Sequence, residues 1–513
     1  MRVLIGLGLH LSSVIGLGAA LPPKTTAPAT AVEWGAWRGD GSGVSQDGRN
    51  VALSWGVNHN VRWKTAIPGY GWSCPVVAGD KVFLTSAVFE SQAAPLRQGP
   101  PSGVEAPDAS IKRQVICLGR STGKILWNQT AAEVRPEHGN HPSNTWATET
   151  PVVDDSRVYA FFGNVGVFCY DFSGKLMWSA NLGSRKTFGN WGTSSSPAFD
   201  GERIFLQCDS NDKSFLIALD KKTGKERWHV PREERSTWST PIVWNNLKRA
   251  ELVCMGSSFI RAYDPSNGRE LWRLASENSM GRSGGPGRDG PPGPPPKSAP
   301  KSESTGGKGG PPPRGGGSGK AGSGGCKSSP VATRDMLYVG MSSRKPGQEF
   351  GPLWAIKPGA TGDISLREGQ TSSSHIAWYR DDAGPHFNSP LVAGDFLYVF
   401  PAHDREGLEC LDARTGDTLY THPLEGSRGF KSSACFVDGK IFNTDEAGTT
   451  FVIEAGSQFK LLHKNALDEM TWSSPAIAGG AVFLRTVSKL YCLAAGGAAN
   501  TPQASLLPSK PTH

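Results

Sequence analysis

Side chains that could carry out chemistry are sparse in this sequence. His138 and His141 have a spacing that zinc ligands can use, but they lie in the loop-like stretch EHGNHPSN with no third ligand nearby. No G-x-S-x-G, phosphate-loop or H-E-x-x-H motif occurs. We therefore expect water-exposed loop histidines, no metal site and no catalytic residue.

Nine cysteines would suggest disulfides in an exported protein. Four of them occupy the same position in different units of an internal repeat, which keeps their Cα atoms further apart than the roughly 6 Å of a disulfide. We predict that they are small buried hydrophobes. A disulfide among the other five is left open. The four are Cys117, Cys169, Cys410 and Cys492.

Aromatic residues shortly precede the openings of most repeat units. Rigid aromatic rings provide large contact areas at low entropic cost. We predict that they converge on the mouth of a central channel, where they either pack the wall or form a platform for a ligand or peptide. They are Trp72, Trp146, Trp191, Trp238, Phe387, Phe430 and Trp472. Polar neighbours that could orient a ligand are Asn144, Asn190, Arg235, His386, Asn388 and Lys431.

The elements that would position these residues come from an internal repeat of roughly 40 to 45 residues. Most units open with Ser or Thr, then Pro and an apolar run, and further apolar runs follow. Runs such as KVFLT at Lys81–Thr85 have the length and composition of strands. Eight openings predict eight four-stranded blades. They lie at Pro75, Pro151, Pro197, Pro241, Pro330, Pro390, Ala434 and Pro475.

The ends of the units carry the most specific signal. A glycine such as Gly123 or Gly224 stands where a tight turn needs a positive φ, and Trp or Tyr follows shortly after it. Each Trp can fill the groove between its blade and the next, which removes about 150 to 250 Å² from water. We predict this docking role for Trp63, Trp127, Trp178, Trp228, Trp272 and Trp378.

The two ends of the repeat region predict how the ring closes. The eighth unit has three strands, the last at Lys489–Leu493, and VRWKTAI at Val61–Ile67 has the pattern of an unpaired fourth strand. Pairing them removes two exposed edges. The sequence therefore predicts an all-β protein, a single eight-bladed propeller over residues 61–495, closed by an N-terminal strand that completes the last blade.

The unit ends, such as ALDKKTGKERW ending at Trp228, resemble the motif A-x-D-x-x-T-G-K-x-x-W of the pyrroloquinoline quinone (PQQ) repeat propellers. The resemblance covers roughly Val61 to Leu493, with degenerate units ending near Trp378 and Leu462. It implies a propeller related both to quinoprotein alcohol dehydrogenases and to the non-enzymatic BamB-like branch. The opening EWGAWRGDGSGVSQDG is also similar to the start of large bacterial members of this family.

The dehydrogenases of this family bind PQQ beside two adjacent cysteines, with calcium held by acidic and amide side chains. This sequence has no Cys-Cys pair and no acidic residue that matches the family's catalytic aspartate. We therefore expect a binding or scaffold protein without a cofactor, with a protein or peptide partner or a small ligand, that could assist envelope assembly. The alternative is a quinoprotein dehydrogenase-like enzyme that uses PQQ and calcium.

The remaining segments concern export and charge. Residues 1–20 have the pattern of a signal peptide without a lipoprotein cysteine, so we expect a periplasmic or secreted monomer with no transmembrane segment. Residues 21–60 are predicted to be extended, and residues 279–328 and 496–513 to be flexible. Much of the net charge of +8 lies in segment 279–328, so nucleic acid is not an expected partner.

Overall fold

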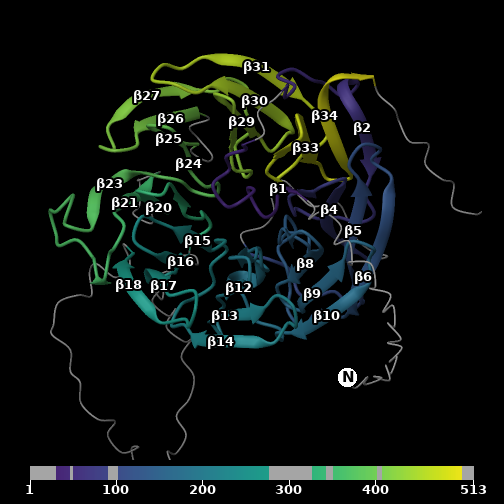
Figure 1. Cartoon of the computed structure of the whole chain (residues 1–513), viewed down its shortest axis with the longest axis horizontal. Coiled ribbons are helices and arrows are strands. Elements are labelled where there is room, and N and C mark those ends of the chain that lie inside the picture. The colour runs from purple at the N-terminus through teal and green to yellow at the C-terminus, as the bar shows by residue number, and fades with distance from the viewer. Residues whose placement is uncertain are drawn as a thin grey trace, which may run out of the picture.

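The computed structural model describes residues 31–46, 50–89, 102–276, 326–342, 350–400 and 407–498. Eight sheets form a closed ring around a central channel (Figure 1). Apart from one 3-10 turn at Phe188–Asn190, the described regular elements are strands. The predicted all-β, eight-bladed propeller is therefore confirmed. The predicted signal peptide and most of segment 279–328 lie outside the described residues, and no described helix is long and apolar enough to cross a membrane.

The first four blades follow one another around the ring. From the channel outward, the first blade contains β3 (Val76–Ala78), β4 (Lys81–Val88), β5 (Ile111–Gly119) and β6 (Ile125–Val134), and the second contains β7 (Val152–Val153), β8 (Arg157–Phe162), β9 (Gly166–Asp171) and β10 (Leu176–Asn181). The third contains β11 (Ala198–Phe199), β12 (Arg203–Cys208), β13 (Phe215–Asp220) and β14 (Glu226–Pro231). The fourth contains β15 (Ile242–Asn245), β16 (Ala250–Cys254), β17 (Phe259–Tyr263) and β18 (Glu270–Ala275), with β22 (Gly362–Asp363) added outside β18.

The other four blades complete the ring. They contain β19 (Val331–Ala332), β20 (Leu337–Gly340), β21 (Gly351–Ile356) and β23 (Ile376–Gly384); β24 (Leu391–Ala393), β25 (Phe396–Val399), β26 (Gly407–Asp412) and β27 (Thr418–Pro423); β28 (Cys435–Val437), β29 (Lys440–Thr444), β30 (Thr449–Glu454) and β31 (Leu461–Ala466); and β32 (Ala476–Ala478), β33 (Ala481–Arg485) and β34 (Lys489–Ala498), with β2 (His59–Ala66) as the outer strand. Each innermost strand begins one residue after a predicted opening.

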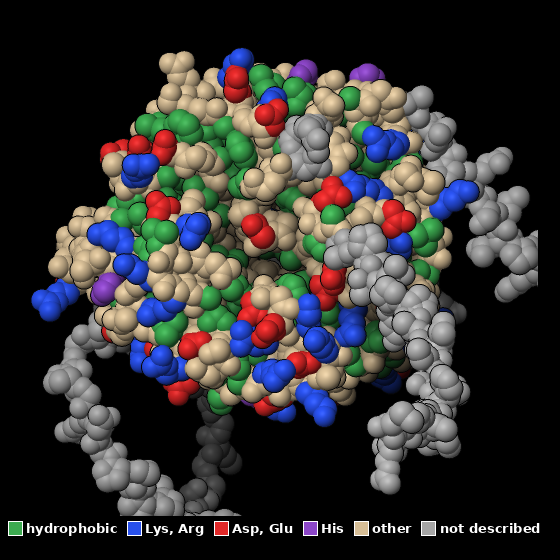
Figure 2. Space-filling model, viewed as in Figure 1, with side chains coloured by type: hydrophobic (Ala, Val, Ile, Leu, Met, Phe, Trp, Pro, Cys, Tyr) green, Lys and Arg blue, Asp and Glu red, His purple; other side chains and the backbone are tan. Residues whose placement is uncertain are grey.

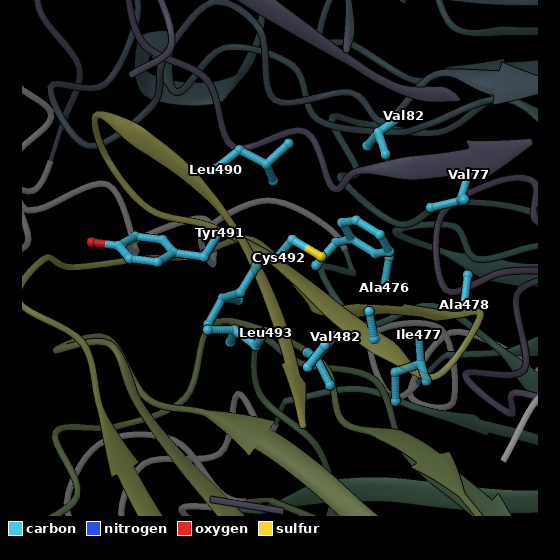
Figure 3. Packing of buried hydrophobic residues seen from close by; sticks show 14 of the residues in the cluster. Val77, Val82, Ala476, Ile477, Ala478, Val482, Leu490, Tyr491, Cys492 and Leu493 are labelled. Carbon is cyan, nitrogen blue, oxygen red and sulfur yellow. The ribbon is translucent and has the colours of Figure 1, made fainter. Parts of the chain in front are cut away.

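The eighth blade joins the two ends of the described chain. β2 pairs antiparallel with β34, so that Trp63 lies opposite Cys492 and Ala66 opposite Lys489. A cluster of buried side chains from β32, β33 and β34 continues into Val77 and Val82 of the first blade (Figure 3). The first and last blades therefore share one hydrophobic core.

Tryptophans connect most neighbouring blades through one repeated contact. In the third blade, Trp228 donates its indole N–H to the carbonyl of Pro265 in the fourth blade (2.9 Å). The ring lies against Gly268, whose φ is 76°, and a Cβ there would lie 2.8 Å from Trp228 Cε3. The same arrangement joins Trp63 to Arg120, Trp127 to Phe172, Trp178 to Lys221 and Trp378 to Ala413.

Trp272, the remaining predicted docking residue, is fully buried but bonds differently. Its indole N–H donates to Oε2 of Glu251 in its own blade (2.6 Å). The fifth blade has no glycine docking turn to receive it, because the connection between β21 and β23 is longer and adds β22 to the fourth blade in parallel. Trp272 is therefore buried as predicted, but its indole N–H does not bond to the next blade as those of the other docking tryptophans do.

The segment at residues 31–46 enters the central channel (Figure 1). β1 (Val32–Trp34) pairs with the channel side of β3, the N–H of Val153 in the second blade donates to Gly35 (2.8 Å), and the N–H of Phe436 in the seventh blade donates to Gly43 (2.8 Å). We call residues 31–46 the channel segment. Its position was not predicted, since residues 21–60 were only expected to be extended.

All nine cysteines lie within the described residues and are buried, and none of them forms a disulfide there. Burial raises the pKa of Cys117, Cys169 and Cys492 to about 12, which keeps these thiols neutral. They act as small apolar residues in the blades, as predicted for this repeat position.

Candidate binding site at the channel mouth

A cavity of about 530 Å³ lies at the end of the channel where the inner strands begin. Two rings of side chains, each with one member per blade, make up most of its wall. Both rings come from the extended segment that leads into each inner strand, because side chains two residues apart in extended chain point to the same side. The sequence repeat thus becomes a circular site.

The first ring consists of the residues directly before the eight openings, and we call it the hydroxyl belt. Each member is less than one-tenth exposed. Its backbone N–H donates to the side chain of the equivalent residue in the next blade, and the series closes on itself. The bonds run from Cys74 to Thr150 (2.9 Å), Thr150 to Ser196 (3.0 Å), Ser196 to Thr240 (3.0 Å), Thr240 to Ser329 (2.8 Å), Ser329 to Ser389 (2.9 Å), Ser389 to Ser433 (2.9 Å), Ser433 to Ser474 (2.8 Å) and Ser474 to Cys74 Sγ (3.2 Å).

The second ring lies two residues before the hydroxyl belt, and we call it the mixed ring. In blade order its members are Trp72, Thr148, Ser194, Trp238, Lys327, Phe387, Lys431 and Trp472, and all eight line the cavity. Trp72 and Trp472, neighbours across the closure of the ring, stack with centroids 5.7 Å apart. The mixed ring therefore has an aromatic arc and, beside it, an arc with two lysines.

Bonds between blades hold the aromatic side chains in place. Trp72 donates its indole N–H to the carbonyl of Ser143 in the loop before the second blade (2.7 Å). Trp238 donates in the same way to Gly192 (2.8 Å). Trp191 packs against Trp238 with centroids 5.2 Å apart. Because Trp72 and Trp238 are bonded to neighbouring blades and Trp472 and Trp191 pack on them, much of the cavity wall is formed before any ligand binds.

Five of the seven aromatic residues predicted at the mouth line the cavity: Trp72, Trp191, Trp238, Phe387 and Trp472. Phe430 does not, because it lies one residue out of register with the mixed ring and a shift of one residue turns a side chain to the opposite side. It is fully buried against Phe400 and Phe451.

Trp146 also lies away from the cavity. Its backbone has a φ of 64°, which interrupts the extended segment four residues before the belt residue Thr150. The guanidinium of Arg113 lies 5.2 Å from the centre of the Trp146 ring, and burial lowers the pKa of Arg113 to about 10. Trp146 therefore packs the interior of the propeller beside a buried cation.

Of the six polar neighbours that were predicted, some line the cavity and others lie away from it. Asn144 and Lys431 line the cavity. Asn388 is buried and donates to the carbonyls of Phe400 and Phe430, and Arg235 is exposed. Of the remaining two, Asn190 bonds to Glu105 and His386 packs against the ring of Phe387.

Several lining residues were missed in the sequence. Trp37 reaches the cavity from the channel segment, and Lys327 from the end of the segment assigned to the flexible insertion. His141, which was expected to be exposed to water, is half-buried in the wall and bonds to Ser143. The signal for the mixed ring was present in the sequence, as the residue three positions before each opening.

The lysines of the mixed ring gather around one aromatic ring. The Nζ atoms of Lys431 and Lys327 lie 3.5 Å and 4.1 Å from the centroid of Phe387. Lys431 also pairs with Glu446 (3.4 Å), which lies behind the wall. Among the described residues that line the cavity there is no Asp or Glu. The cavity is therefore apolar and positively charged.

The donor set does not suit calcium, which takes six to eight oxygen ligands and usually includes carboxylates. Hydroxyl groups dominate the polar wall, and two ammonium groups stand beside them. Within the described ranges, no three His, Cys, Asp or Glu side chains are grouped so that they could hold a metal ion.

A second cavity, of about 1190 Å³, lies beside the channel segment and differs in charge. The charged residues in its wall are the four acids Glu33, Asp40, Asp154 and Asp155 and the base Lys221. The face of the ring shown in Figure 2 is hollowed at its centre and carries acidic side chains around the hollow. Trp37 and Thr240 belong to both cavities, so the channel segment separates an acidic space from a basic one.

Eight four-stranded blades, most of them joined by tryptophan docking, with a cavity at the mouth of the channel, give this chain the fold of the PQQ-like propellers. Within the chain, residues 111–287 match the family described as outer membrane protein assembly factor BamB. No curated protein matches the sequence.

Three solved structures are similar to the chain. The quinohemoprotein alcohol dehydrogenase of Comamonas testosteroni is 10% identical, with a TM-score of 0.53 over 95% of this chain and 84% of that one. A second such enzyme, from Pseudomonas putida HK5, is 10% identical, with a TM-score of 0.53 over 93% and 82%. BamB from Moraxella catarrhalis is 13% identical, with a TM-score of 0.48 over 80% and 99%. The likeness to the dehydrogenases shows the fold alone.

Proposed function

We propose that this chain is a binding protein that holds a segment of a protein partner in the channel-mouth cavity. The observation that supports this most directly is the wall of aromatic rings around a space of about 530 Å³, in which Trp72 and Trp238 are held by bonds to neighbouring blades. Cavities of this size with apolar walls and a few fixed polar groups are typical binding sites. A preformed wall also lowers the entropic cost of binding.

The proposed setting is outside the cytoplasm, in the periplasm or the medium, with the chain as a monomer. The pattern of residues 1–20 and the match of residues 111–287 to the BamB family support it. A role in envelope assembly is part of this proposal, because the matched family is described as an assembly factor.

The test is a comparison of captured partners. Wild-type protein and the double variant Trp191→Ala, Trp238→Ala are immobilised and exposed to envelope extract, and bound proteins are identified by mass spectrometry. Leu247→Ala is the matched control, since Leu247 is an exposed apolar side chain far from the cavity lining. We expect a partner bound by the wild type and the control that the double variant loses. Equal capture by all three would contradict the proposal.

The alternative is a dehydrogenase that uses PQQ and calcium, which the shared fold of the two alcohol dehydrogenases favours. The lysine-rich wall without carboxylates speaks against calcium at this cavity. Reduction of a redox dye by purified protein incubated with PQQ, calcium and a primary alcohol would favour the enzyme and overturn the binding proposal.

A further inference from the structure

The charge of the channel-mouth cavity is placed on one side. Lys327, Phe387 and Lys431 are consecutive members of the mixed ring, in blades five, six and seven. Both ammonium groups lie within about 4 Å of the same ring centroid, so two positive charges share one aromatic ring of the wall. A carboxylate beside either ammonium group would gain a favourable charge interaction.

The opposite side of the mixed ring has small residues. Thr148 and Ser194, in blades two and three, leave room that Trp191 and His141 partly fill. A ligand therefore meets aromatic rings and ammonium groups close together, since the Nζ atom of Lys327 lies 5.2 Å from the Trp191 centroid as well as 4.1 Å from that of Phe387. The cavity has a direction, which an eightfold-symmetric wall would not have.

The hydroxyl belt adds hydrogen-bond donors around the cavity. A hydroxyl group has one hydrogen to donate and two lone pairs. In the seven Ser and Thr members, the bond from the neighbouring blade uses a lone pair of the oxygen, which leaves the hydrogen to point toward an acceptor. These side chains are at least nine-tenths buried, so an acceptor in the cavity would meet donors that are already fixed.

We propose that the cavity selects partner segments that carry a carboxylate beside an aromatic or large apolar side chain. The carboxylate would lie beside Lys327 or Lys431 and accept from adjacent belt hydroxyls, and the apolar group would pack on Trp191 and Trp238. Charge-assisted bonds of this kind are the stronger class of hydrogen bond. This inference rests on the proposed function and names the chemistry of the segment.

The experiment uses two synthetic pentapeptide libraries, both N-acetylated, with acidic, neutral and basic residues equally frequent at every position. One library ends in a carboxylate and the other in an amide, which separates chain-end carboxylates from side-chain carboxylates. Each is passed over immobilised full-length protein, and bound peptides are sequenced by mass spectrometry. We expect enrichment of peptides with a carboxylate and an aromatic residue, and depletion of basic residues.

The variants test where the preference arises. Lys327→Gln leaves the Lys431–Glu446 pair intact, and the double variant with Lys431→Gln removes both charges. We expect about a tenfold loss of affinity for acidic peptides in the double variant, with aromatic preference retained. Lys222→Gln with Lys225→Gln is the control, since both lysines are exposed on a turn outside the cavity lining. It should bind as the wild type does, and a melting curve confirms that each variant is folded.

The outcomes separate this inference from the proposed function. One outcome is that Trp191→Ala with Trp238→Ala abolishes peptide capture, while the peptides bound by the wild-type protein show no enrichment of carboxylates. The binding proposal then stands and the inference fails. An acidic preference that persists in the double lysine variant also overturns the inference. If neither library yields peptides whose capture depends on these tryptophans, both proposals fail.

Discussion

The junction between blades three and four differs from the next one, between blades four and five. Trp228 crosses the first junction and donates to the Pro265 carbonyl of the following blade. Trp272 occupies the equivalent position at the second junction but donates to Glu251 behind it. Both indoles are at least nine-tenths buried, so both blades gain similar hydrophobic contact. They differ in the acceptor of the indole N–H, which lies in the following blade for Trp228 and in the same blade for Trp272.

This difference shows that the docking motif combines two separable contributions. Burial of the indole is retained at the irregular junction, where Trp272 packs with Leu337, Trp354 and Ile376 of the fifth blade. The bond between blades is lost there, and the parallel pairing of β22 with β18 supplies another connection. The irregular junction therefore depends on a buried carboxylate and on an added strand.

Of the changes considered, truncation at the closure of the ring should lower the stability of the fold the most. Removal of residues through Ile67 takes away β2 and Trp63, exposes the edge of β34 and removes the channel segment. We expect aggregation or a much lower melting temperature, since an unpaired strand edge pairs with other chains. Truncation through Lys24 is the control and should melt as the full chain does. Equal melting of the two would show that β2 does not stabilise the closure.

Replacement of the docking indole by alanine should lower the free energy of unfolding by a similar amount at both junctions. Trp228→Ala and Trp272→Ala each leave a large cavity between blades, and we expect about 3 to 5 kcal/mol of lost unfolding free energy from each. Denaturant unfolding of the two variants measures it. A cost below about 1 kcal/mol for one of them would mean that its groove closes around the smaller side chain.

A methyl group on the docking glycine should test the contact from the other side. In Gly268→Ala the new Cβ meets Trp228 and the backbone keeps a φ near 76°, so we expect a loss of about 2 to 4 kcal/mol. Gly201→Ala is the matched control, with a φ of 93° and open space around its Cβ, and should lose only about 1 to 2 kcal/mol. Equal losses would place the whole cost in the backbone and none in the Trp228 contact.

Replacement of each indole by a phenyl ring isolates the polar contribution. Trp228→Phe leaves a carbonyl without its donor, which we expect to cost about 1 kcal/mol beyond the lost volume. Trp272→Phe leaves Oε2 of the fully buried Glu251 without this donor, and hydrogen bonds to charged groups contribute about 1.5 to 3 kcal/mol. The unfolding free energies should therefore fall further for Trp272→Phe. The reverse order would show that Arg249 and Asn246, which bond to its other oxygen, satisfy the carboxylate without the indole.

Sequence reasoning predicted the parts of this fold that local chemistry repeats. The eight openings and the glycine turns recur in the chain, so their positions and blade number followed from periodicity. The channel segment has no repeat, and its place depends on contacts with distant blades such as Val153 and Phe436. At the candidate site, proximity to an opening was the wrong criterion for Phe430. Alternation along extended chain, which selects Lys431, was the physical rule that mattered.

The smallest expected effect is a pH dependence of the regular docking turn. Asp220 accepts from the N–H groups of Lys222 and Thr223, and Arg227 pairs with its other oxygen. Burial disfavours the carboxylate, but the bonds from Arg227 and Thr223 outweigh it and lower the pKa of Asp220 to about 2.

Because this pKa lies below the unfolded value of about 3.9, the contribution of Asp220 is fully present above about pH 4 and is lost as the pH falls toward 2. We expect at most about 1 kcal/mol, since the Arg227 partner is largely exposed and screened by water. Urea unfolding of wild type and Asp220→Asn between pH 6 and 2.5 measures the difference, which should shrink on acidification. A difference that stays constant over this range would show that the turn does not depend on the charge of Asp220.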